Sequence, residues 1–575
     1  MTYQQRKEQT VMNRNTEMHF SQVPSIGISR SKFDRSFDHK TTFNNGELIP
    51  VYVDTTIMPG DTVKMRMSEV VRMMTPIAPV MDNAYLDTYF FFVPKRLLWD
   101  HFKRFMGEND SAPWTQTTEY TEPQITAPAN GWSVHTLADY MGYPTGVHGT
   151  DGWKASALPF RAYAMIWNEW FRDENLKNPV YISTGDSDTT GKDYDVNTYD
   201  PVTDTECGAK PLKVAKLHDY FTSALPGAQK GPAVNIPLGS AAPVIYSEAG
   251  IIPAGYNQLD SALVGQKAQY MNNAYDYAPM DETGATTYSV QGANQVFSLV
   301  TDLSNAVGAT VNQLRQAFAI QKFYERQARS GSRYIEVVKG HFDVTNPDFR
   351  VQRPEYLGGR RIPININQVV QTDATKEYSI YDSDTSTWIT KDGTPQGNAA
   401  AYSVTADSNE DLFTKSFTEH GILMGLVCVR TDHSYQQGLN RQFSMKKFTD
   451  YFWPEFSNLG ETAILNKEIF LSGTESDDEA AFGYQEAWAN YRYFPNIITG
   501  EMRSTYAQSL DIWHYGDDYS QLPSLGSDWI DEPTENMART LAVQSHNQLF
   551  GDFYFGAVYT RPMPLYSVPG LIDHH

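Results

Sequence analysis

Residues 185–192, GDSDTTGK, carry the residue types of a phosphate-binding loop, in which glycine N–H groups and a lysine hold phosphate oxygens. The two glycines are one residue too far apart for such a loop, and Asp193 stands where a serine or threonine would bind magnesium. The residues before the loop lack the pattern of a strong strand. The segment therefore does not predict a nucleotide site.

The next residues carry a weak signal for calcium. Asp193, Asp195, Asn197 and Asp204 occupy the first, third, fifth and twelfth positions of a calcium-binding loop. Thr198 stands where that loop needs glycine, and Asp204 replaces the bidentate glutamate. A solvated acidic loop explains the same residues. The four stay a weak calcium candidate, and we assign no metal.

The other residue types used in catalysis are isolated in the sequence. No H-E-x-x-H motif is present, and the 13 histidines are scattered. The two cysteines, Cys207 and Cys428, are far apart, which excludes a disulfide framework and a cysteine-rich zinc site. Cys428 lies in the apolar run GILMGLVCVR of residues 421–430, where a core role is expected. We expect a protein without a catalytic centre or a cofactor.

Basic residues concentrate in an N-terminal arm, residues 1–45. The net charge of the whole chain is −22, yet seven basic residues face four acidic ones up to Lys40. Lysine and arginine in such an arm can neutralise phosphates and release counterions. An ordinary solvated terminus has the same composition. The candidate nucleic-acid-binding residues of the arm are Arg6, Lys7, Arg14, Arg30 and Lys32.

The segments that must position these residues predict a mainly β protein. Aromatic residues make up 13% of the chain and proline occurs 31 times, as is typical of strands joined by long loops. Residues 83–94, NAYLDTYFFFVP, alternate as a strand does and are apolar on both faces in their second half, which predicts a strand covered on both sides. Further strands are expected at residues 48–53, 62–72, 334–338, 362–370, 421–430 and 553–560, and helices at 97–106, 160–171 and 311–329.

Composition also suggests how the chain is divided. Residues 46–238 and 311–575 have the patterned segments of one body, whereas residues 239–310 are rich in Ala, Gly, Asn and Tyr. We expect 239–310 to be a surface insertion, and a separate small domain is the alternative. Residues 353–361, RPEYLGGRR, are expected to be a turn-rich basic segment, and residues 373–411 a polar, exposed excursion.

Long segments of the sequence resemble the major capsid proteins of gokushoviruses, which are small single-stranded DNA bacteriophages of the Microviridae. The blocks follow one order along nearly the whole chain, which is far more specific than a short motif. They are residues 21–54 (SQVPSIGISRSKFDRSFDHKTTFNNGELIPVYVD), 89–109 (YFFFVPKRLLWDHFKRFMGEN), 218–234 (HDYFTSALPGAQKGPAV), 320–336 (IQKFYERQARSGSRYIE), 353–372 (RPEYLGGRRIPININQVVQT), 454–470 (PEFSNLGETAILNKEIF), 482–493 (FGYQEAWANYRY) and 563–572 (MPLYSVPGLI).

This resemblance implies an eight-stranded antiparallel viral jelly roll with large loop insertions and a few helices. It implies sixty copies in a T=1 icosahedral shell around circular single-stranded DNA, and localisation in the virion after assembly in the host bacterial cytoplasm. Residues 239–310 stand where the family has an outward insertion near the three-fold axis, used in host attachment. The implied partners are other copies of the chain, the genome, a scaffold or internal protein, a DNA pilot protein, and a host receptor that includes glycans among its candidates.

Two other classes of protein fit the composition. The 11 tryptophans and 35 tyrosines would suit sugar stacking in a β-rich carbohydrate-active enzyme, which would depend on a carboxylate pair. A glycan-binding protein is the third alternative, and it is compatible with the capsid protein through the insertion. Assembly into a particle far larger than the 65.0 kDa chain separates the first class from the enzyme.

Overall fold

The computed structural model describes most of the chain, and contact density divides the chain into two compact units. One unit is Met1–Ala228 with Gln327–His575, and the other is Gln229–Arg326. The described residues are 29–109, 118–148, 152–232, 234, 244–246, 269–271, 277–279, 299–301, 311–364, 367–370, 373–382, 387–391, 393, 399–407 and 411–566.

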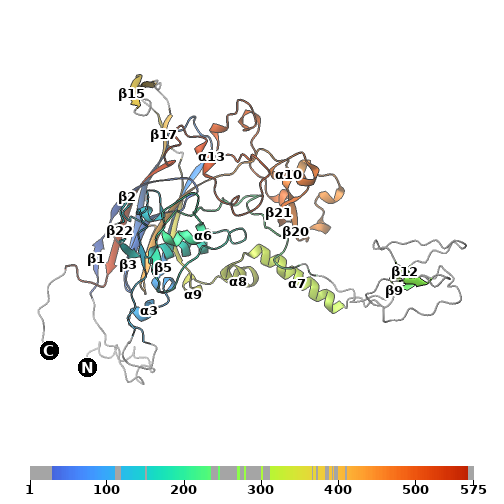
Figure 1. The fold of residues 1–575 in the computed structure, drawn as a ribbon, viewed down its shortest axis with the longest axis horizontal. Coiled ribbons are helices and arrows are strands. Elements are labelled where there is room, and N and C mark those ends of the chain that lie inside the picture. Colours follow the sequence, from blue (N-terminus) through green and yellow to red (C-terminus); the bar gives the residue numbers. More distant parts are fainter. Residues whose placement is uncertain are drawn as a thin grey trace, which may run out of the picture. The chain divides into compact units, whose positions relative to one another are not determined.

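The first unit is built on two antiparallel sheets, and the larger sheet has seven strands (Figure 1). Its strands run in the order β1-β22-β4-β17-β14, with β2 also beside β22 and β18 also beside β4. In β4, buried Val63, Met65 and Met67 alternate with the solvent-facing Lys64 and Arg66, because successive side chains of a strand point to opposite faces. The strands are β1 (Ser31–Asp34), β2 (Phe37–Phe43), β4 (Thr62–Met73), β14 (Asn367–Val370), β17 (Ala399–Asp407), β18 (Phe413–Ser416) and β22 (Leu549–Arg561).

The second sheet has four strands, in the order β13-β5-β19-β3. Its central strand β19 pairs with β5 over its whole length, from Gly421 opposite Pro94 to Thr431 opposite Ala84. Nearly every residue of β19 is buried, as the apolar run at 421–430 predicts. The strands are β3 (Ile49–Ile57), β5 (Ala84–Pro94), β13 (Glu355–Pro363) and β19 (Gly421–Thr431).

The main core lies between the two sheets, which therefore form a sandwich. Phe90 and Phe92 of β5 join Met65 of β4 and Phe553 and Phe555 of β22 in one apolar cluster. Burying a phenylalanine side chain contributes about 2 kcal/mol to stability, so this layer is the principal source of cohesion between the sheets. The architecture agrees with the mainly β jelly-roll fold expected from the sequence.

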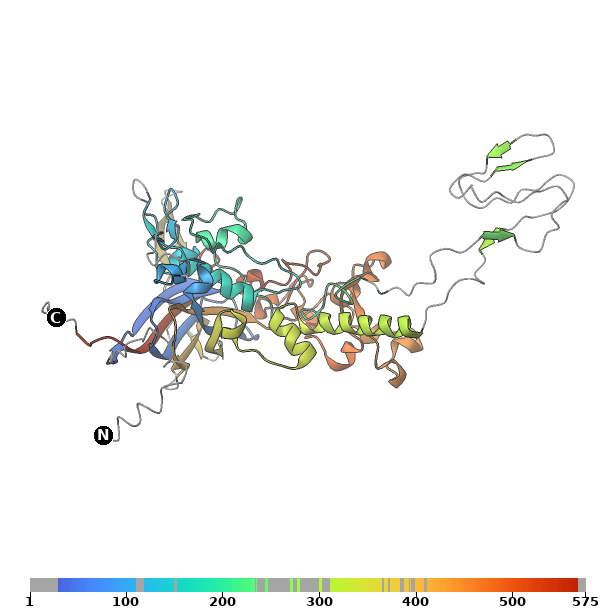
Figure 2. The same ribbon diagram turned by 90° about the horizontal axis from the view of Figure 1, so that it is seen from below.

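The other face of the second sheet is also covered, by helices seen from a different side in Figure 2. Phe91 and Val93 of β5 belong to a second apolar cluster with Phe160 and Tyr163 of α5 (Leu158–Ile166). The prediction that residues 83–94 form a strand covered on both sides is thereby confirmed. The helix expected at 160–171 is also present, and it passes from α5 into the π-helical turn η1 (Trp167–Phe171).

The helix expected at 97–106 is interrupted. It consists of α2 (Lys95–Leu98) and α3 (Phe102–Phe105), because Trp99 between them is extended. The Trp99 indole N–H donates to Asp186 Oδ1 over 2.6 Å, and this bond fixes the tryptophan against the 183–188 loop. The remaining elements of this region are β6 (Gln124–Thr126), β7 (Lys154–Ser156), β8 (Thr189–Thr190), α4 (Leu137–Tyr140), α6 (Pro201–Asp204) and η2 (Thr205–Cys207).

Residues 432–548 add a lobe of short elements around a third apolar cluster, which includes Phe221, Tyr435, Ile464 and Phe482. Its only described strand pair is β20 with β21, and most of its turns are single 3-10 turns. The elements are η4 (Arg441–Phe443), η5 (Phe448–Asp450), η6 (Pro454–Phe456), β20 (Glu461–Leu465), α10 (Asn466–Ile469), α11 (Glu475–Asp478), β21 (Ala481–Glu486), α12 (Ala489–Arg492), η7 (Gly500–Met502), η8 (Asp511–Trp513) and α13 (Thr534–Ala538).

The second unit contains the expected insertion, residues 239–310, of which only two strand pairs are described. β9 (Val244–Tyr246) pairs with β12 (Leu299–Thr301), and β10 (Gln269–Met271) pairs with β11 (Tyr277–Pro279). The long helix expected at 311–329 is confirmed as α7 (Val311–Ser330). Among the described residues, no helix is long and apolar enough to cross a membrane.

One predicted strand is a helix. Residues 334–338 begin α8 (Tyr334–Phe342), although their β-branched residues favour a strand. The carboxylate of Glu336 accepts the backbone N–H of Arg333 at 3.1 Å and also pairs with the Arg333 guanidinium at 3.2 Å, which caps the first turn. The short helix α9 (Asp348–Val351) follows.

Two predicted loops contain strands. Residues 353–361, expected to be turn-rich, lead into β13, where Gly359 allows the close approach of β5. The excursion expected at 373–411 holds the hairpin of β15 (Tyr378–Asp382) and β16 (Thr387–Lys391), but its later part is β17, which pairs with β4 in the large sheet. The strand expected at 362–370 is divided between the end of β13 and β14.

Candidate assembly and nucleic-acid surfaces

The candidate nucleic-acid-binding residues are described only in part. Arg6, Lys7 and Arg14 lie outside the described residues. The guanidinium of Arg30 donates to Thr62 Oγ1 at 2.5 Å and to the Thr560 carbonyl at 3.2 Å. Lys32 of β1 stands opposite Thr560 of β22 and is exposed. The structure thus brings Arg30 and Lys32 to the solvent side of the large sheet.

That solvent side, here called the open face, carries further basic and aromatic side chains. Arg72 of β4 pairs in register with Phe550 of β22, and Tyr554 stands opposite Ser68 four residues further along each strand. Phe550 and Tyr554 are each more than 40% exposed, although aromatic side chains are costly to leave in water. Together with Lys64, Arg66, Lys32 and Arg30, they mix positive charge with aromatic rings, as single-stranded nucleic acid sites do.

Carboxylates compensate part of the charge on the open face. Asp411 pairs with Lys64 at 2.8 Å and Arg66 at 2.9 Å, and their hydrogen bonds hold its pKa below the ordinary value. Asp552 pairs with Lys40 at 3.3 Å. Arg72 instead lines a groove of about 770 Å³ at one end of the open face, which is also lined by His39, Lys40, Thr41, Thr42, Val70, Val134, His135, Asp139, Tyr140, Phe550, Gly551 and Asp552.

Sequence reasoning missed Arg72, Phe550 and Tyr554 as surface candidates. The alternation in residues 62–72 marks Lys64, Arg66 and Arg72 as one face of a strand, so their common direction was readable. Their juxtaposition with Phe550 and Tyr554 depends on the pairing of β4 with β22 from the far end of the chain. No local signal reports that pairing.

The four residues of the weak calcium candidate serve separate local contacts. Asp193 accepts the N–H and hydroxyl of Ser133 at 2.8 and 2.7 Å, and Asp195 accepts the N–H of Asn197 at 3.0 Å. Asp204 is buried and pairs with Lys192 at 2.5 Å. Within the described part of the chain, no group of three or more His, Cys, Asp or Glu side chains is placed to hold a metal ion.

A group of buried charges forms a network centred on His433. His433 lies between Asp517, at 3.2 Å from Nδ1, and Glu532, at 3.0 Å from Nε2. Burial alone would lower the pKa of His433, but the charge of Asp517 and the hydrogen bonds of both carboxylates raise it to about 10. Lys216 and Asn536 also bind Asp517. A fully paired network of this kind fixes packing, and none of its carboxylates is left available as a general base.

A second network of ion pairs joins three strands of the second sheet. The buried carboxylate of Asp87 on β5 receives Arg361 from β13 at 2.5 Å and Arg430 from β19 at 2.5 Å. Arg430 also donates to the Tyr89 hydroxyl at 2.6 Å. Cys428, on the same strand, is fully buried, and burial raises the pKa of its thiol to about 12, which keeps it protonated and unreactive. The expectation of a core role for Cys428 is confirmed.

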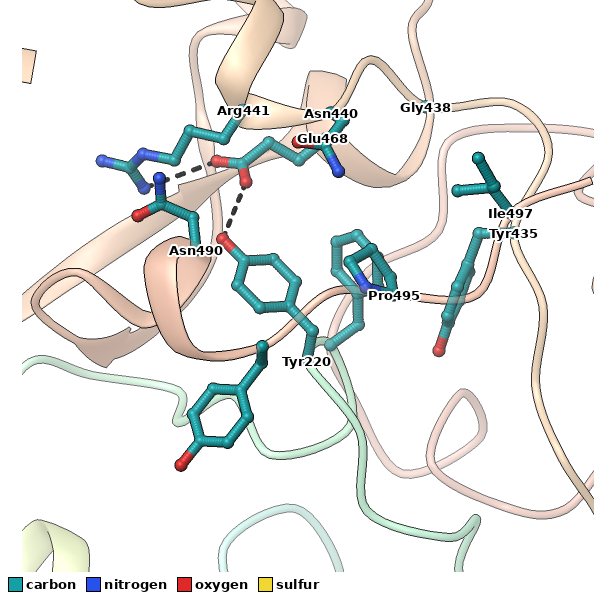
Figure 3. Close-up of a pocket in the computed structure, with 11 residues that line it drawn as sticks. Tyr220, Tyr435, Gly438, Asn440, Arg441, Glu468, Asn490, Pro495 and Ile497 are labelled. Atoms are coloured by element: carbon teal, nitrogen blue, oxygen red, sulfur yellow. Dashed lines mark hydrogen bonds and ion pairs between the residues drawn. The ribbon is translucent and has the colours of Figure 1, made fainter. Parts of the chain in front are cut away.

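A cavity of about 50 Å³ opens in the third-cluster lobe (Figure 3). The Tyr220 hydroxyl donates to Glu468 at 2.9 Å, and Arg441 approaches the same carboxylate at 3.5 Å. Burial raises the pKa of Glu468. The cavity has room for a few water molecules or the end of one side chain, which is far below the size of a substrate site. Its other lining residues are Phe221, Tyr435, Gly438, Asn440, Asn490, Tyr493, Pro495 and Ile497.

Known proteins match this chain over nearly its whole length. The family model described as capsid protein (F protein) of phages matches residues 21–571. The capsid protein VP1 of Bdellovibrio phage phiMH2K is 41% identical, with 97% of this chain and 98% of the relative covered. Capsid protein VP1 of Chlamydia phage 1 is 38% identical, covering 96% and 97%, and capsid protein VP1 of Spiroplasma virus 4 is 38% identical, covering 97% and 98%.

These matches confirm the resemblance drawn from the sequence blocks, and they decide between the capsid protein and the enzyme. The relatives are capsid proteins rather than enzymes, and they match over nearly their whole length, so the carbohydrate-active enzyme is excluded. The chain belongs to the phage capsid protein (F protein) family and is a major capsid protein of the gokushovirus type, a structural protein of the virion.

Proposed function

We propose that sixty copies of this chain form a T=1 icosahedral shell that encloses a circular single-stranded DNA genome. The observation that carries this proposal is the family match over residues 21–571, which includes both sheets of the sandwich and the loops between them. A shell subunit needs a rigid body and several unlike contact surfaces around the symmetry axes. The buried networks at Asp87 and His433 support such a rigid body.

Imaging and sedimentation of purified particles test this proposal. We expect a closed shell with icosahedral symmetry whose protein mass is sixty times that of the 65.0 kDa chain. The nucleic acid extracted from it should be degraded by a nuclease specific for single strands and should resist exonuclease because it is circular. An open or helical assembly, or double-stranded DNA, would contradict the proposal.

Binding of the genome is proposed for two parts of the chain. One is the basic arm, residues 1–45, with Arg6, Lys7 and Arg14, and the other is the open face, to which the arm itself contributes Arg30 and Lys32. Phosphate attraction and base stacking bind single strands without reading their sequence, which suits a coat that must accept a whole genome. The mixed charge and aromatic rings of the open face support the second assignment.

The proposed function also includes a host receptor, a scaffold or internal protein, and a DNA pilot protein as partners. The insertion at residues 239–310 is proposed to project outward and to contact a host receptor, with glycans among the candidates. Assembly in the host cytoplasm would use a scaffold or internal protein, and a DNA pilot protein would accompany the genome. Particles whose 239–310 segment is exchanged for that of a relative with another host should change their adsorption to cells and keep their assembly. Unchanged adsorption would contradict this role.

A further inference from the structure

The third-cluster lobe exposes an unusual amount of apolar surface. Eleven large apolar side chains between residues 443 and 497 expose from 44% to 73% of their area, and nine of them are eight aromatic residues and Ile497. We call this set the aromatic surface. Its members are Phe443, Phe448, Tyr451, Phe452, Trp453, Tyr491, Tyr493, Phe494 and Ile497.

Several of these side chains are neighbours in space as well as in sequence. The ring centroids of Phe452 and Tyr491 are 6.3 Å apart, and both rings contact Trp488. Tyr493 and Ile497 line the cavity of Figure 3, so one side of the aromatic surface contains a small recess. The set therefore includes a cluster of rings around Trp488 and a small recess, rather than only scattered exposed residues.

Hydrogen bonds hold this surface in one shape. The Trp453 indole N–H donates to the Phe448 carbonyl at 2.9 Å, which closes the 448–453 turn on itself. The Trp488 indole N–H donates to the Phe456 carbonyl at 2.8 Å, and the Tyr491 hydroxyl accepts the Phe452 N–H at 3.3 Å. These bonds join the two segments that carry the aromatic residues. A surface that is already ordered loses little conformational entropy when a partner binds.

The exposed area matches that of a stable protein interface. Aromatic residues have about 200 Å² of surface each, so nine residues that are about half exposed present on the order of 1,000 Å². A monomeric soluble protein has a largest apolar patch of about 300–600 Å². A standard protein interface covers about 800 Å² on each partner. The aromatic surface has the area that one partner protein would bury.

The balanced charge around the aromatic surface favours a protein partner over nucleic acid. The exposed cations next to the aromatic rings are Lys446, Lys447 and Arg492, and they are balanced by Asp450, Glu455 and Glu486. Glu486 pairs with Arg492 at 2.9 Å, and Asp450 accepts the backbone N–H groups of Lys446 and Lys447 at 2.8 Å. A site for single-stranded DNA would need a surplus of positive charge. A neutral surface rich in aromatic residues is typical of the core of a protein interface.

We propose that the aromatic surface is an interface with a second copy of this chain, and that shell assembly depends on it. This inference rests on the proposed function, because the shell supplies the second copies. The recess beside Tyr493 and Ile497 would receive the end of a side chain from the neighbouring subunit. Aromatic anchors that enter a recess contribute much of the binding energy of an interface.

Two pairs of substitutions in the full chain test the interface. Phe448→Ser with Phe494→Ser removes two exposed rings from the aromatic surface, and Tyr181→Ser with Val196→Ser removes two similarly exposed side chains elsewhere. Each variant is expressed with the other proteins of the virus, and particles are counted by sedimentation. We expect the first pair to lower the particle yield about tenfold or more, and the control pair to leave it unchanged. Equal yields for the two pairs would overturn the proposal.

Folding and partner identity are measured separately. The unassembled subunit of each variant should keep the wild-type melting temperature, because the replaced side chains are exposed. A lower melting temperature for the Phe448/Phe494 pair would attribute lost yield to folding and overturn the interface.

A photo-reactive amino acid at position 494 should cross-link wild-type particles into a band of twice the chain mass. Cross-links to DNA or to another protein would reject the second copy, and a wild-type chain that cross-links in pairs without a closed shell would reject only the proposed shell.

Discussion

At the scale of single residues, buried charged side chains join separate segments of the chain through ion pairs. His433 bridges Asp517 and Glu532, which both lie between η8 and α13. Arg430 and Arg361 from two strands hold Asp87 on a third. A buried pair adds little net stability over an apolar pair of the same shape, but removal of one partner leaves a charge without compensation. The loss of stability on a substitution at these positions therefore depends on whether a buried charge is left without a partner.

The His433 network predicts a loss of stability in alkali. The pKa of His433 is raised from 6.5 to about 10, so its stabilising contribution is complete below pH 6.5 and disappears as the pH rises through 10. The unassembled wild-type subunit should lose urea resistance between pH 7 and 10.5. His433→Gln should be less stable at pH 7 by about 3 kcal/mol and should lose less over that interval. Parallel pH curves for the two proteins would contradict this role.

The Asp87 network predicts unequal effects for its two arginines. The side chain of Arg430 is 15% exposed and that of Arg361 is 43% exposed, so water screens the Arg361 pair far more. Arg430→Met should lower the midpoint of urea unfolding clearly, because Asp87 then keeps only its partly screened partner. Arg361→Met should have an effect of about 1 kcal/mol or less. Equal midpoints for the two variants would show that burial does not set the strength of these pairs.

At the scale of elements, sequence patterns predicted β3, β4, β5, β19 and β22 of the sandwich, whereas β1, β2 and β18 lie in segments for which no strand was predicted. Strict alternation marked β4, and continuous apolar runs marked β5 and β19, because a strand covered on both faces needs apolar residues on both. The same reasoning failed for α8, where a cap at Arg333 and Glu336 outweighed β-branched residues. It also failed for β17, which lies in a segment expected to be an exposed excursion and pairs with β4 in the large sheet. Local patterns report burial, whereas pairing between distant strands leaves no local mark.

Glycine positions in the strands yield a matched test of sheet pairing. A Cβ atom at Gly359 of β13 would lie 2.0 Å from the Thr88 carbonyl oxygen of β5, a backbone atom that cannot move without breaking the pairing. A Cβ atom at Gly556 of β22 would meet nothing closer than 3.4 Å. Gly359→Ala should therefore lower the melting temperature of the subunit by several degrees, and Gly556→Ala should leave it nearly unchanged. A destabilised Gly556→Ala variant would show that glycine is needed for another reason.

At the scale of the whole molecule, acidic and basic residues are unevenly distributed. The chain carries a net charge of −22, while its arm is net basic. Sequence reasoning identified the arm from that contrast and placed Arg30 and Lys32 among the candidates. It could not identify the open face, since Arg72 and Phe550 meet only through the pairing of β4 with β22. An acidic protein that binds a polyanion must gather cations at particular sites. The arm and the open face are the two proposed sites, and each is tested separately.

The arm is tested by removal of its charge. Replacing Arg6, Lys7 and Arg14 together with glutamine should weaken genome retention in assembled particles and make it less sensitive to salt, because three phosphate contacts and their released counterions are lost. The measurement is the DNA content of particles after washing at increasing salt concentration. Particles of unchanged DNA content with an unchanged salt slope would remove the arm from the genome-binding surface.

The open face is tested by separating its two kinds of contact. Arg72→Gln removes one positive charge next to Phe550 and should reduce the salt slope of genome retention, whereas Phe550→Ser removes a ring and should weaken retention with no change in slope. Lys64→Gln is the matched control, because Lys64 is already paired with Asp411 and has less charge to offer a phosphate. The same washed particles report all three variants. If Lys64→Gln changed the slope as much as Arg72→Gln, the ion pairs of the open face would open in the particle, and the genome would contact the whole face rather than the groove at its end.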